Sequence, residues 1–174
     1  MMSNVAVDIV AEELEDLKKR IIANMRNENA VASGRTIKSL TITKYNGGVK
    51  LWSNQSMPFG VMETGRKGGD VPGGFRFIIQ QWMKDKGVHA DPMPYTTDRP
   101  HKYTPQERAD RSMAYLIARK IKTDGTRLNR MKGRKTIYSN EIPTTLERIK
   151  QRIGVFISSE VAKSITNNQY NFEE

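Results

Sequence analysis

The sequence contains no cysteine, only two histidines and no long apolar run. The absence of cysteine excludes disulfides, thiolate zinc sites and thiol nucleophiles. No apolar stretch approaches the ~20 residues of a membrane span, so we expect no transmembrane helix. The apolar stretch at residues 5–10 is short, contains Asp8 and is followed by acidic residues, so we expect no signal peptide.

Few residues point to catalysis. His89 and His101 lie in a proline-rich stretch, and neither has the neighbouring ligands that a metal site requires. The glycine-rich residues 68–74 lack the Gly-Lys-Ser/Thr ending of a phosphate-binding loop. Glu63 and Arg66 invite reading as an acid/base pair, but such residues ordinarily form an ion pair or a solvated surface. We therefore expect no enzyme activity, no metal and no cofactor.

The net charge of +10 is distributed unevenly along the chain. Residues 99–135 contain twelve Lys/Arg and three Asp/Glu, whereas the first seventeen residues contain five acidic residues and no basic one. Opposite poles of this kind suit a head-to-tail contact between copies of the chain, although two solvated faces are the simpler alternative. The candidate subunit-interface residues are Glu12, Glu13, Asp16, Glu63, Arg66, Arg127, Arg130 and Arg134.

Apolar periodicity predicts a helix over residues 3–27, with Ser3 as its N-cap. Its buried stripe is expected to contain Val7, Val10, Leu14, Leu17, Ile21 and Met25. A second helix is expected over residues 77–86, with Gly87 as its C-cap.

Two further helices are predicted in the second half of the chain. Residues 104–107 form a capping box with proline at the first helical position, and this helix should end at Gly125. Its expected buried stripe is Met113, Leu116, Ile117 and Ile121. Residues 144–147 offer another capping box, and the stripe of this last helix is Leu146, Ile149, Ile153, Phe156, Ile157, Val161 and Ile165.

Alternating residues 39–45 and 49–52, joined by Asn-Gly-Gly, predict a β-hairpin. A short strand at residues 136–138 and a short helix or strand edge at 57–62 are also expected. Residues 68–74 and 89–103 should be irregular loops that partner proteins order. The fold class is therefore α+β, with a small antiparallel sheet packed by an N-terminal helix, two or three further helices and long loops. Residues 1–166 are treated as a single domain, and 167–174 as a polar tail.

Four stretches occur in an order that resembles the tail-completion and head–tail joining proteins of tailed bacteriophages. They are VASGRTIKSL (31–40), FGVMETGRKGG (59–69), YLIARKIKTDGTRL (115–128) and ERIKQRIGVFISSEV (147–161). Glu63-Thr64-Gly65 matches the family's characteristic element, while Phe59 replaces its usual tyrosine. The resemblance implies a virion ring subunit of the neck or tail, assembled in the host cytoplasm. Such a subunit joins portal-bound adaptors to tail proteins and forms part of the DNA conduit.

The alternative is a basic nucleic-acid-binding module that uses residues 99–135. Against it, Tyr103 is the one aromatic residue of this segment expected to be free to stack on bases, since Tyr115 falls within a helix. An enzyme of an unrecognised type is the third possibility.

Overall fold

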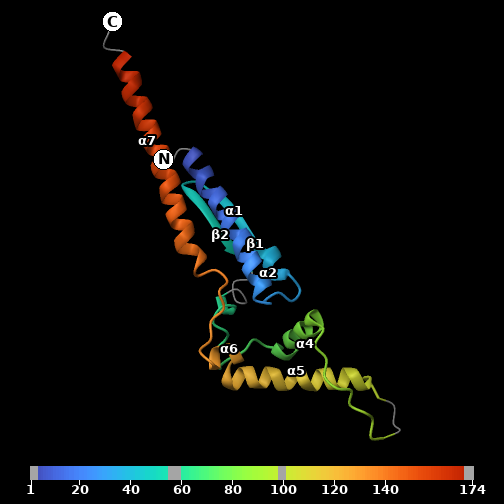
Figure 1. Cartoon of the computed structure of the whole chain (residues 1–174). Coiled ribbons are helices and arrows are strands. Elements are labelled where there is room, and N and C mark those ends of the chain that lie inside the picture. Colours follow the sequence, from blue (N-terminus) through green and yellow to red (C-terminus); the bar gives the residue numbers. More distant parts are fainter. Residues whose placement is uncertain (1–3, 55–59, 98–100, 171–174) are drawn as a thin grey trace. The chain divides into compact units, whose positions relative to one another are not determined.

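The computed structural model describes residues 4–54, 60–97 and 101–170, with the backbone alone for 167–170. The expected α+β class is confirmed (Figure 1). Contacts group the chain into two compact units. Unit 1 comprises residues 1–29, 37–56 and 136–174, and unit 2 comprises 30–36 and 57–135. The single domain over residues 1–166 stays a prediction.

Unit 1 is built on the predicted hairpin, which is confirmed. Strand β1 (Leu40–Tyr45) pairs antiparallel with β2 (Gly48–Ser53), with Leu40 opposite Ser53 and Ile42 opposite Leu51. The turn places Gly47 at φ 98°, a conformation that glycine adopts without strain. The short helix α2 (Arg35–Ser39), directly before β1, was not expected from the sequence.

Helix α1 (Asn4–Asn27) contacts both the hairpin and helix α7 (Glu141–Tyr170). The expected N-cap Ser3 lies outside the described residues. Leu17, Ile21 and Met25 are buried as predicted. Because α1 has neighbours on two sides, its buried surface is wider than one stripe, and it also includes Ala6, Ala11 and Glu13.

Helix α7 runs antiparallel to α1 and departs from the sequence prediction at two points. It begins at Glu141, so the predicted capping box at residues 144–147 is wrong. The expectation that its apolar stripe is entirely core is also wrong. Ile149, Ile153 and Phe156 are half-buried, but every residue from 157 to 166 is exposed. In Figure 1 this part of α7 continues past the start of α1.

Unit 2 pairs helix α4 (Phe75–Lys86) with helix α5 (Pro105–Asp124). Their buried contact consists of Ile79, Met83, Ala114 and Ala118. Gly87 caps α4, the Thr104–Glu107 capping box opens α5, and Gly125 ends it, as predicted. Leu116, however, is 58% exposed, because the two alanines occupy the face of α5 that meets α4.

Residues 126–139 contain the short helix α6 (Arg127–Arg130). The strand expected at residues 136–138 is wrong, because this segment pairs with no strand. Ile137 is nevertheless fully buried, and its carbonyl accepts a hydrogen bond from Asn24 Nδ2 at 3.1 Å. The element expected at residues 57–62 lies largely outside the described residues. No helix in the described part is both long and apolar enough to cross a membrane.

Candidate interaction surfaces

The Glu63-Thr64-Gly65 element lies against the α5–α6 connection within unit 2. Glu63 is 1% exposed, and its Oε2 lies 3.3 Å from Arg134 Nη2. Its carbonyl accepts a hydrogen bond from the amide of Lys135 at 2.8 Å. The structure therefore joins Glu63 to Arg134, two of the candidate residues, inside one chain. This buried carboxylate stabilises unit 2 and is not displayed on its surface.

Glycines allow the backbone of this element to approach α5 and α6 closely. Gly65 has φ 73°, and an added Cβ would lie 2.8 Å from the amide nitrogen of Asn129. The Arg66 amide donates to Thr126 Oγ1 at 2.9 Å, and the Thr126 amide donates to the Arg66 carbonyl at 2.8 Å. The Arg66 guanidinium also bonds the Asp70 carbonyl and lies 5.9 Å from the centroid of the Phe75 ring.

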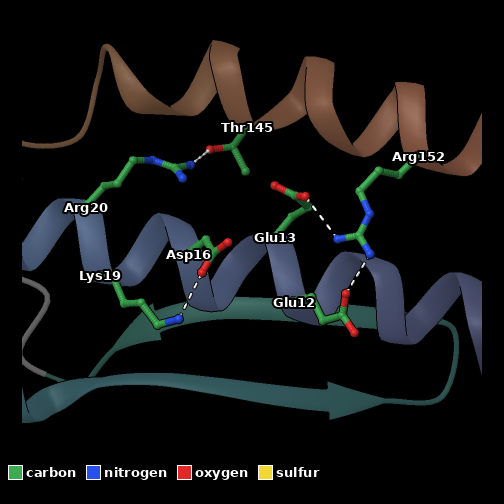
Figure 2. A network of polar contacts seen from close by, with 7 residues as sticks. All are labelled: Glu12, Glu13, Asp16, Lys19, Arg20, Thr145 and Arg152. Carbon is green, nitrogen blue, oxygen red and sulfur yellow. Dashed lines mark hydrogen bonds and ion pairs between the residues drawn. The ribbon is translucent and has the colours of Figure 1, made fainter.

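Two acidic residues of α1, Glu12 and Glu13, face a single arginine of α7. Arg152 Nη1 donates to Glu13 Oε1 at 3.0 Å, and its Nη2 donates to Glu12 Oε2 at 2.6 Å (Figure 2). Asp16 pairs instead with Lys19 at 3.0 Å, and this hydrogen bond lowers the pKa of Asp16. Since Glu13 is only 7% exposed, Glu12 and Asp16 are the two that remain open to solvent.

The basic candidates around α6 also have partners within the chain. Arg130 lies 3.7 Å from Asp124, whose pKa is lowered chiefly by a hydrogen bond from Lys120. Arg127 Nε lies 3.5 Å from the sulfur of Met131. A contact between the acidic and basic candidates of neighbouring subunits would therefore have to add to, or replace, these bonds. That contact stays a prediction.

The net positive charge of the protein lies in one unit. Unit 2 contains eighteen Lys/Arg and eight Asp/Glu, which is a net charge of +10. Unit 1 contains eleven of each, which is a net charge of zero. The sequence indicated a basic segment, but it did not indicate that the whole excess gathers in one packed body.

The two histidines lie in the loop before α5. His89 Nδ1 is 3.0 Å from Asp110 Oδ2, and Asp110 also accepts the amide of Ala90 at 2.8 Å. These bonds, that of His89 foremost, lower the pKa of Asp110. His101 stacks on Tyr95 with ring centroids 3.9 Å apart. His89 thus bonds the loop to α5, whereas His101 contacts another residue of the loop itself. The described residues contain no group of three or more metal-binding side chains.

The exposed end of α7 is a surface that the sequence analysis missed. We call residues 157–166 the α7 arm. Ile157, Val161 and Ile165 are each more than half exposed and recur every four residues, so they form one ridge. With Phe156, Glu160 and Ser164 they line a shallow hollow of about 320 Å³. The apolar residues recur at the predicted helical spacing, but no described part of the chain covers the stripe that they form in the arm.

Comparisons with known proteins find no relative. No family model, no curated protein and no solved structure matches the chain. The likeness to phage neck and tail proteins therefore rests on the order of the four motifs.

Proposed function

We propose that the chain is a structural subunit of the neck or tail of a tailed bacteriophage, which assembles with copies of itself into a ring. In the virion the ring joins the portal or its adaptor to the tail and lines part of the DNA conduit. The motif order supports the family, and one structural observation, the exposed apolar ridge of the α7 arm, supports the assembly.

The α7 arm has the properties of a surface that a protein partner covers. In proteins most helical stability comes from the packing of an apolar face, and the described residues leave the apolar face of this arm uncovered. Burying the remaining exposed area of Ile157, Val161 and Ile165 contributes roughly 1 kcal/mol per side chain. These residues therefore favour association over a free arm.

The charges of unit 1 are compatible with a second copy of this chain as the partner. Unit 1 has no net charge, so two copies that meet through unit 1 experience little long-range repulsion. Contact between two copies of unit 2, each with a net charge of +10, is opposed. Repeating an unlike-face contact by rotation closes a ring.

The test is the mass of the purified protein in solution, combined with negative-stain imaging. Ile157→Glu with Val161→Glu should convert rings to monomers while leaving the helical circular dichroism unchanged. The matched control, Ser159→Glu with Thr166→Glu, adds the same charge on the opposite side of α7 and should assemble. If both variants form rings equally well, the arm is not part of the interface. A parent protein that stays monomeric at all concentrations would contradict self-assembly.

A second candidate function is nucleic-acid binding by unit 2. The observation that favours it is the concentration of the whole net charge in that unit, which includes the basic residues 99–135.

A further inference from the structure

A groove on unit 2 combines aromatic and basic side chains. It has a volume of about 700 Å³ and lies between the first turns of α4 and the last turns of α5. Its walls carry Phe75, Phe77 and Tyr115, and its basic residues are Arg76, Arg119 and Lys122. Among the described residues that line it, none is acidic. The aromatic residues of α4 are therefore brought to the basic residues of α5, some forty positions later in the sequence.

Two of the three rings of this groove are accessible. Phe77 is 51% exposed and Tyr115 is 52% exposed. The guanidinium of Arg76 lies 4.6 Å from the centroid of the Phe77 ring, so a cation and an aromatic face already adjoin there. Tyr115 lies within α5, as the sequence predicts, but on the exposed side of that helix.

The basic residues of the groove are free to bind an anion. Within the described residues, Arg76, Arg119 and Lys122 form no ion pair, whereas neighbouring Lys120 pairs with Asp124 at 2.5 Å. They belong to the unit that holds the whole net charge of +10. A polyanion is therefore attracted to the unit as a whole and meets unpaired cations at the groove.

We propose that this groove binds single-stranded nucleic acid, with bases stacked on Phe77 and Tyr115 and phosphates paired with Arg76, Arg119 and Lys122. Exposed rings beside a basic track are the arrangement that single strands use, because unpaired bases offer their faces for stacking. A duplex hides those faces and would contact the cations alone. The inference concerns unit 2 and does not depend on ring assembly.

The probe is a short fluorescein-labelled oligothymidylate, and its binding to the full chain is followed by fluorescence anisotropy. The parent should bind it more tightly than a duplex of the same length. Phe77→Leu with Tyr115→Leu keeps apolar bulk but removes both rings, and should weaken binding roughly tenfold per ring. Thermal melting confirms that each variant is folded.

The basic residues have a separate readout in the salt dependence. Arg119→Gln with Lys122→Gln should reduce the slope of log affinity against log salt by about 1.4, since each phosphate contact with a single strand contributes about 0.7. The charge-matched control is Lys67→Gln with Lys84→Gln, two exposed residues of the same unit that do not line the groove. This control should retain the slope.

Three results would overturn the proposal. A duplex bound as tightly as the single strand would assign the surface to backbone contacts alone. Unchanged affinity in the leucine variant would exclude stacking. The third result is displacement of the oligonucleotide by polyglutamate at equal charge, combined with unchanged oligonucleotide binding by the leucine variant. It would indicate a docking surface for an acidic protein segment.

Discussion

Glu13 and Arg152 lie 139 positions apart in the sequence and form one of the ion pairs that join α1 to α7, at 3.0 Å. The Glu13 carboxylate is buried, so removing its partner leaves an uncompensated charge inside unit 1. We expect Arg152→Gln to lower the free energy of unfolding, measured by urea denaturation.

The matched control is Lys150→Gln, two positions before Arg152 on the same helix, which removes an exposed pair with Glu147. Exposed pairs of this kind contribute little, so Lys150→Gln should be close to neutral. A double-mutant cycle of Arg152→Gln with Glu13→Gln should give a favourable coupling energy. Equal effects of the two single substitutions at residues 150 and 152 would show that the pair does not hold α7 to α1.

Gly65 is one of the glycines of unit 2 that the structure constrains closely. Its φ of 73° and the close approach of Asn129 exclude a Cβ without local rearrangement. Gly65→Ala should therefore lower the stability of the protein by about 2 kcal/mol or more. Gly73→Ala is the control, because an added Cβ meets nothing within 4 Å there, and it should change stability by less than about 0.5 kcal/mol. A neutral Gly65→Ala would contradict the observed packing of this element.

The hydrogen bonds to Asp110 predict that the free energy of unfolding depends on pH in the acidic range. They hold the pKa of Asp110 below its ordinary value of 3.8, so they favour the folded state fully above that value. This contribution is lost as the pH falls through the lower, folded-state pKa. Asp110→Asn should thus be less stable than the parent at about pH 5, and the difference should shrink below pH 3.8. A difference that stays constant down to pH 2, followed by urea denaturation, would contradict this account.

Features that short stretches of sequence encode were predictable. The hairpin follows from alternation and an Asn-Gly turn, and the start of α5 follows from a capping box at Thr104. Each depends on residues within a few positions of one another. The same holds for the ends of α4 and α5, where Gly87 and Gly125 stop the helix.

Features that depend on distant partners were not predictable. Periodicity located the apolar residues of α7, but the position of α1 decides that Ile153 is half-buried and Ile157 exposed. In α5 the small residue Ala114 meets α4, so the larger Leu116 is left outside. The pairing of the α1 acids with Arg152 had no local signal. Because of this pairing, a reversal of the charges of Glu12 and Glu13 would disrupt unit 1 itself.

The α7 arm should open locally in the free subunit, because residues 157–166 are exposed along their whole length. Trypsin should therefore cut after Lys163 in dilute protein, where the side chain forms an exposed pair with Glu160. If copies of the chain cover the arm, concentrated protein that has formed rings should be protected at this bond. Cleavage after Lys102, which lies in the loop before α5 and away from the arm in sequence, is the comparison and should not depend on whether the arm is covered. Cleavage after Lys163 at the same rate in monomers and in rings would show that assembly leaves the arm uncovered.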